Sequence, residues 1–210
     1  MIFNTLVRKS GGGTSVERGI EFLSIDSSNR VTGVRVHGDI IPANSFRTWA
    51  GYVSTLEAPD VTTIGATAFQ DSFSASNNLI LNFPEVTSVG GSAFAGSARY
   101  PVSMSFPKWT NVTGSNTFTV YARGNLQTVL FGSVGHPVTM FANNLFYING
   151  SYAFDITCTI YTDGAYADTA LANARNRLLD ATIIIKAAVD TTYGGNIYSA
   201  GETIITSTPT

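Results

Sequence analysis

The sequence is poor in charge and contains a single cysteine. Charged residues make up 12% of the 210-residue chain, which is about half of their usual share in a soluble domain. The net charge is −2 and the arginines are scattered, so we expect no nucleic-acid partner and no attraction to an anionic membrane. Cys158 has no partner for an intrachain disulfide and no neighbours for a thiolate metal site, so we expect it in the core.

Long hydrophobic runs and recognisable catalytic motifs are also missing. No stretch approaches the length of a membrane span, and the N-terminus has no apolar run of the length that a secretory signal needs. We therefore expect no membrane insertion and no export by the usual route. The two histidines, His37 and His136, lack the spacing of metal ligands, and no phosphate loop or nucleophile elbow is present. We expect no metal, no cofactor and no enzyme activity.

The sequence does contain a repeated motif between residues 56 and 132. Each copy begins with a short alternating strand that ends at a proline, and closes with glycine, a small residue and phenylalanine. The glycines lie at positions 65, 90 and 114 and the phenylalanines at 69, 94 and 118, in steps of 25 and 24 residues. Such a period predicts a solenoid, in which each coil covers the core of its neighbour. We expect the glycine to form a turn with positive φ. The predicted repeat core consists of Ile64, Phe69, Val89, Phe94, Val112 and Phe118.

The pattern predicts a mostly β protein with short helices, divided into four segments. Residues 1–18 are interpreted as a flexible N-terminal arm and residues 19–38 as a capping hairpin. The solenoid spans residues 39–186 and closes with a helix over 166–179 and a strand, and residues 187–210 form a C-terminal tail.

The segments between the copies differ in composition, as binding segments of solenoids do. Variable positions project from one edge of a solenoid and commonly carry recognition. Aromatic and arginine side chains are the usual anchors of interfaces. The candidate binding residues are Phe73, Tyr100, Tyr121 and Arg123.

One column of the repeat raises the question of catalysis. Asp60 and Glu85 follow the proline in adjacent copies, which places two carboxylates about 5 Å apart at strand spacing. Such a pair could act on a glycan. The next copy has Lys108 in this column, so the column predicts a solvated charge ladder in which Glu85 faces Lys108.

The motifs Ile64-Gly65…Ala68-Phe69 and Val89-Gly90…Ala93-Phe94 resemble the BspA-like leucine-rich repeats of bacterial surface antigens. The resemblance covers roughly residues 40–186. It implies a right-handed leucine-rich-repeat solenoid of about 23–25 residues per coil with terminal caps, used for protein or glycan contact without catalysis. Proteins of this kind also occur in bacteriophages and prophages, as tail or fibre-associated parts of the virion.

These observations together predict a noncatalytic virion protein. We expect its solenoid surface to contact other virion proteins or a host cell-surface protein or glycan during host attachment, and we leave homo-oligomerisation open. Two alternatives remain: an adhesin on a bacterial cell surface, and a glycan-cleaving solenoid similar to a phage tailspike.

Overall fold

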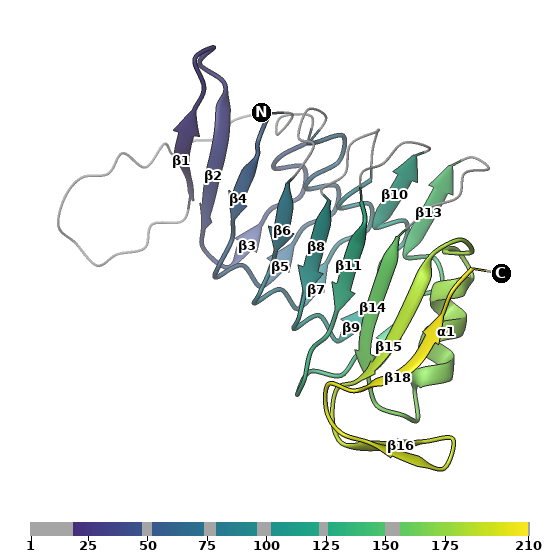
Figure 1. Cartoon of the computed structure of the whole chain (residues 1–210). Coiled ribbons are helices and arrows are strands. Elements are labelled where there is room, and N and C mark those ends of the chain that lie inside the picture. Colours follow the sequence, from purple (N-terminus) through teal and green to yellow (C-terminus); the bar gives the residue numbers. More distant parts are fainter. Residues whose placement is uncertain are drawn as a thin grey trace.

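A computed structural model shows the chain wound into a β-solenoid of about five coils (Figure 1). It describes residues 19–47, 52–73, 79–95, 102–121, 126–149 and 156–209. These residues are mostly in strands, and the described part of the chain contains one short helix, α1 (Ala167–Arg175). The predicted mostly β class and the solenoid arrangement are confirmed.

The widest sheet runs along one side of the solenoid, and consecutive coils supply its parallel strands. These are β6 (Ile80–Asn82), β8 (Ser103–Phe106), β11 (Thr128–Phe131), β14 (Thr157–Thr162) and β15 (Thr182–Ala187). The strands are in register, so equivalent residues form rows across the sheet. One row consists of Leu81, Met104, Val129, Cys158 and Ile183, all buried. Because side chains alternate between faces, the residues on either side of this row point away from the core.

A second, three-stranded sheet lies at the N-terminal end. It is formed by β1 (Gly19–Ile25), β2 (Val31–His37) and β4 (Thr55–Glu57). β1 and β2 make an antiparallel hairpin within the segment that the sequence predicts as a capping hairpin, and β2 then pairs with β4 in parallel. The hairpin therefore joins the solenoid through backbone pairing with the first full coil.

The other sides of the coils are formed by very short strands and turns. β3 (Ile40–Ile41), β5 (Thr63–Ile64) and β7 (Ser88–Val89) form one row, and β9 (Asn111–Val112) pairs with β12 (Met140–Phe141). Beyond them, turns of successive coils are joined by backbone hydrogen bonds such as Phe69 N–H to the Ala93 carbonyl (2.8 Å). The parallel pair β10 (Phe118–Tyr121) and β13 (Phe146–Asn149) continues this ladder.

Two stacks of phenylalanine rings fill the core. In the longer stack, which runs through Phe46, Phe69, Phe94, Phe118 and Phe146, successive ring centroids are 5.0, 5.2, 5.4 and 5.2 Å apart. Phe83, Phe106 and Phe131 form the second stack, with centroids 5.3 and 5.9 Å apart. The six residues that the sequence assigns to the repeat core are all buried. Each coil thus buries aromatic surface against the coil before and the coil after it.

The repeat glycines are required for a different reason than the sequence suggests. Gly114 has the expected positive φ of 139°, but Gly65 and Gly90 do not. A Cβ at Gly65 or Gly90 would lie 2.4 Å from a backbone nitrogen of the preceding coil, so the glycine permits close stacking of coils. The positive φ falls two residues later, at Thr67 (55°) and Ser92 (56°).

The helix near the C-terminal end packs against the core with its small residues. Ala167, Ala170 and Ala174 are buried, as is Leu178 just beyond the helix. Helix α1 ends at Arg175, which is shorter than the predicted span of 166–179. The buried alanines, at i, i+3 and i+7, lie on one face of the helix, which packs against β14 and β15.

Residues 187–209, which the sequence analysis treats as a tail, add to the solenoid. β18 (Thr203–Ser207) pairs antiparallel with β15 and becomes the sixth strand of the wide sheet. A small hairpin of β16 (Thr191–Tyr193) and β17 (Asn196–Tyr198) precedes it and projects from the lower end of the molecule in Figure 1. The segment belongs to the sheet because Ile204 and Ile205 pack on the core.

Candidate functional site

Of the four binding residues predicted from the variable segments, Phe73 is the one whose side chain the structure describes. Phe73 is only 2% exposed, and its ring stacks on Phe69 with centroids 5.4 Å apart. The ring of Phe73 is therefore part of the core and is not available as a surface anchor. Tyr121 ends β10, but its side chain, like Tyr100 and Arg123, lies outside the described residues.

The charged column of the repeat forms the expected ladder. Lys108 Nζ donates to Glu85 Oε2 at 2.6 Å, and both side chains are about two-fifths exposed. This contact confirms that Glu85 faces Lys108. Asp60 is exposed on the preceding coil. In this arrangement the Glu85 carboxylate is engaged in an ion pair on an open surface, which is the geometry of a structural charge ladder.

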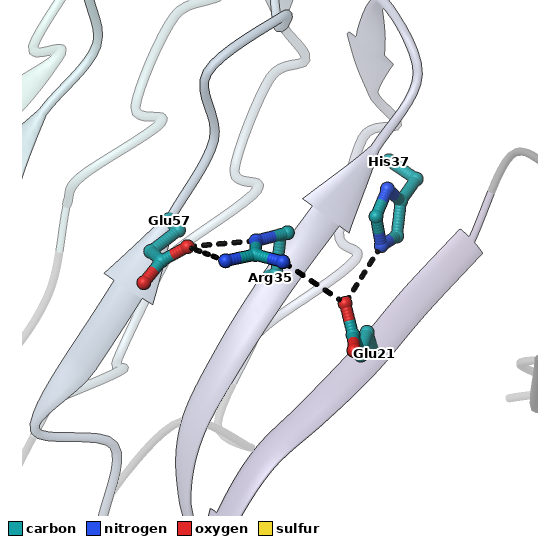
Figure 2. Close-up of polar contacts among 4 residues, drawn as sticks. All are labelled: Glu21, Arg35, His37 and Glu57. Carbon is teal, nitrogen blue, oxygen red and sulfur yellow. Dashed lines mark hydrogen bonds and ion pairs between the residues drawn. The ribbon is translucent and has the colours of Figure 1, made fainter. Parts of the chain in front are cut away.

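A larger polar cluster lies on the outer face of the sheet, the side that points away from the core, near the N-terminal end. Figure 2 shows its four residues, here called the charged zone: Glu21 on β1, Arg35 and His37 on β2, and Glu57 on β4. The strand register places Arg35 directly between Glu21 and Glu57. Arg35 Nε and Nη2 donate to Glu57 Oε2 at 2.7 and 2.5 Å, and Nη1 approaches Glu21 Oε2 at 3.4 Å.

The electrostatics of the charged zone keep Arg35 charged and bound. The hydrogen bond and charge of Glu57, with a smaller effect of Glu21, raise the pKa of the Arg35 guanidinium above its usual value. His37 Nε2 lies 3.0 Å from Glu21 Oε2, so one carboxylate oxygen contacts both the imidazole and the guanidinium. The side chains are 28–42% exposed, and cross-strand pairs of this kind join neighbouring strands. The charged zone thus connects the hairpin to the first coil.

The outer face of the wide, six-stranded sheet carries uncharged hydroxyl groups. The residues of this hydroxyl zone are Ser103, Ser105, Thr128, Thr157, Thr159 and Thr182. Ser103, Thr128, Thr157 and Thr182 are direct neighbours across four strands, and Thr128 Oγ1 lies 2.8 Å from Ser103 Oγ. Strands in a sheet lie about 4.8 Å apart, so these four hydroxyl groups form a regular row of donors and acceptors. In the next row, Leu130 lies between Ser105 and Thr159.

Sequence reasoning missed the hydroxyl zone because it followed the apolar half of each strand. The sequence nevertheless contains a pattern that indicates the zone, because polar residues alternate with the apolar residues in these strands. Ser103 and Ser105 flank Met104, and Thr157 and Thr159 flank Cys158. Because the register aligns Met104 and Cys158 with Val129 between them, their flanking residues also align.

The described residues contain no group of three or more His, Cys, Asp or Glu side chains that could hold a metal ion. Cys158 is fully buried, and desolvation raises the pKa of its thiol to about 12, so the thiol stays protonated near neutral pH. In the same part of the chain, no helix is long and apolar enough to span a membrane.

The resemblance to BspA-like repeats rests on the repeat motifs themselves. Comparison of the chain with protein-family models, curated proteins and solved structures finds no match in any of the three. What the residues and the structure identify is an architecture, a β-solenoid of about five coils.

Proposed function

We propose that this protein is a noncatalytic binding and structural component of a virion. In this proposal, the outer face of the wide sheet contacts other virion proteins or a host cell-surface protein or glycan during attachment. The observation that carries the proposal is the continuous row of the hydroxyl zone, Ser103, Thr128, Thr157 and Thr182, in which in-register strands hold uncharged donors and acceptors side by side. A regular row of this kind suits contact with an extended ligand, because short hydroxyl side chains lose little freedom on binding.

The noncatalytic part of the proposal is supported by the positions of the titratable groups. The carboxylates of Glu21, Glu57 and Glu85 all contact cationic side chains on exposed sheet surface. General acid–base catalysis needs a carboxyl group within reach of a bound substrate, with a pKa tuned by its surroundings. The ion pairs instead give these carboxylates a role in joining strands.

We further propose that the coils are right-handed BspA-like leucine-rich repeats. The support is the equivalence of the repeat positions, since Phe69, Phe94 and Phe118 stack on one another and Ile64 pairs with Val89. Leucine-rich repeats usually carry helices on the convex face, whereas the described coils carry two-residue strands and turns on the sides away from the wide sheet. The proposal is therefore a variant in which two-residue strands and turns replace those helices.

The first test is whether the protein sediments with intact virions. Virions from a lysed culture would be purified on a density gradient, and the protein would be quantified by mass spectrometry in the virion fraction and in washed host cells. We expect it in the virion fraction. Recovery only on the bacterial surface would contradict the virion assignment and favour the adhesin.

The second test addresses the binding face. Purified protein should compete with virions for adsorption to host cells, and the double variant Thr128→Glu, Thr157→Glu should compete at least about tenfold less well, because it places unpaired carboxylates in the contact. Thr87→Glu, at an exposed position outside the hydroxyl zone, is the matched control. Release of new reducing ends from host polysaccharide would contradict the noncatalytic assignment.

A further inference from the structure

The wide sheet ends at β18, and this strand leaves one backbone edge open. In the sheet order, β18 has β15 on one side and no strand among the described residues on the other. Figure 1 shows β18 at the margin of the sheet, with α1 behind it. An edge strand exposes N–H and C=O groups that can pair with another chain.

The hydrogen-bond pattern shows which groups of β18 point outward. Thr182 N–H donates to the Ile156 carbonyl next to β14, so the backbone N–H and C=O groups of the even-numbered residues of β15 point toward β14. Those of the odd-numbered residues therefore point toward β18. Ile183 and Ile185 therefore bond with their direct partners Ser207 and Ile205. Thr206, which lies between these partners, directs its backbone N–H and C=O away from the sheet.

The edge at β18 is a better template for pairing than β1, the outer strand of the three-stranded sheet at the N-terminal end. β1 shifts register on both sides of Ser24, and such bulges disrupt the spacing of edge hydrogen bonds. In β18 the pairing is regular from Ile205 to Ser207, and none of the side chains of the strand is charged. Natural edges are protected from pairing by charges, prolines and bulges, and this stretch of β18 contains none of them.

A fixed position is the second property that favours pairing at β18. Arg175 Nε and Nη2 donate to Ser207 Oγ at 3.2 and 2.8 Å, and Nη2 also donates to the Ser207 carbonyl. The same guanidinium is bonded to the chain that follows α1 through the Ala181 carbonyl. Because β18 is held in place before a partner arrives, little backbone freedom is lost when its outer edge pairs.

We propose that β18 pairs antiparallel with β18 of a second copy of this chain, about a two-fold axis. The occupant is a second copy because antiparallel pairing of a strand with itself is self-complementary and closes after two subunits. Pairing of β18 with the bulged β1 edge would instead continue into an open filament. The dimer joins two six-stranded sheets, so two hydroxyl zones lie on one continuous surface. Dimerisation can occur whether or not the proposed function is correct.

The test is the dissociation constant of the dimer, measured on the full chain by sedimentation velocity over a dilution series. Thr206→Pro removes the outward N–H and keeps the bonds to β15, since proline is tolerated at that side of an edge strand. We expect the dissociation constant to rise about tenfold or more, because two-fold symmetry removes two hydrogen bonds. Thr206→Val keeps the N–H and should dimerise like the original protein.

A protein that stays monomeric from micromolar to millimolar concentration would overturn the proposal, as would a dimer that Thr206→Pro leaves unchanged. If Thr206→Pro fails to fold, amide hydrogen exchange on the original chain decides the question. We expect the Thr206 amide to be protected only at dimer-forming concentrations and the Ile205 amide at all concentrations. Equal exchange of Thr206 at both concentrations would refute β18 pairing. Because this readout concerns subunit association alone, it stands apart from the virion and adsorption tests.

Discussion

The middle coils of the solenoid and its two ends are stabilised by different kinds of interaction. In the middle, Phe69, Phe94 and Phe118 stack on their equivalents in the next coil, and Gly65 and Gly90 allow the coils to approach closely. At the ends, polar side chains add contacts to the apolar packing. The difference follows from the repeat: a middle coil finds its partner in the next copy of itself, whereas an end has no next copy and needs other groups to satisfy its backbone.

The two ends also differ from each other. At the N-terminal end, Arg35 joins side chains across three strands on an exposed surface. At the C-terminal end, Arg175 Nη1 donates to the carbonyls of Leu178, Leu179 and Ala181 at 3.2, 2.9 and 2.7 Å. One end is thus held by ion pairs that water and salt weaken, and the other by hydrogen bonds to backbone carbonyls, which are costly to leave unpaired.

The largest expected effect tests the middle. Phe94→Ala should lower the free energy of unfolding by about 3–5 kcal/mol, because rings on both sides prevent the cavity from closing. Chemical denaturation would measure the loss. Tyr147→Ala, at an exposed aromatic on β13 two coils further along the stack, is the control and should cost less than about 1 kcal/mol. A similar loss for both variants would show that ring stacking is not the main contribution to the stability of the middle coils.

The next prediction separates two adjacent glycines. Gly90→Ala should destabilise by about 3 kcal/mol, because its Cβ would lie 2.4 Å from the Ala66 backbone nitrogen. A Cβ at Gly91 meets its nearest atom at 3.4 Å, so Gly91→Ala should be neutral or stabilise by about 0.4–1 kcal/mol. Both variants would be measured by urea denaturation. Equal effects would mean that close coil stacking does not explain the repeat glycine.

A third prediction concerns the C-terminal end. Arg175→Ala should lower the free energy of unfolding by about 2–3 kcal/mol, because it leaves several carbonyl groups without donors. Arg175→Lys should recover little of this loss, since an ammonium group cannot reproduce the several hydrogen bonds of the planar guanidinium. Arg177→Ala, an exposed arginine close by, serves as the control in thermal denaturation. Full recovery by lysine would indicate that charge, and not hydrogen-bond geometry, matters.

The N-terminal end should respond less to the same kind of change. Arg35→Ala is expected to lower the midpoint of thermal unfolding by less than Arg175→Ala, because the Arg35 ion pairs are exposed. The difference between Arg35→Ala and the original protein should shrink as salt is added, since screening already weakens the pairs. A salt-independent loss larger than that of Arg175→Ala would reverse the proposed contrast between the ends.

The smallest effect concerns pH at the turn of the hairpin. The Arg30 backbone N–H, followed by the Arg30 side chain and the Ser28 N–H, lowers the pKa of Asp26 below 3.8. A carboxyl whose pKa falls on folding stabilises the native state above its unfolded pKa, and this contribution disappears as pH drops through the lowered value. The stability difference between the original chain and Asp26→Asn should therefore be present at neutral pH and vanish in strong acid. A pKa of Asp26 at or above 3.8, measured by NMR titration, would contradict this.

The sequence predicted the inner half of the fold better than the surface. Ile64, Val89 and Phe94 were placed in the core because apolar periodicity reports burial directly. Phe73 was misplaced, because an aromatic residue in a variable segment has the same composition whether it points out or in. The φ of Phe73 is 64°, and its ring stacks on Phe69. No local sequence pattern predicted this turn.

The sequence alone determined that the chain is a solenoid, where its coils repeat, and that Glu85 faces Lys108. Each of these depends on residues at a fixed period, and a period is visible without coordinates. Only the tertiary structure decided why Gly90 is needed, which hydroxyl groups share the outer face, and that β18 completes the sheet. These features arise between segments that are distant in sequence, where the register of one coil on the next sets which atoms meet.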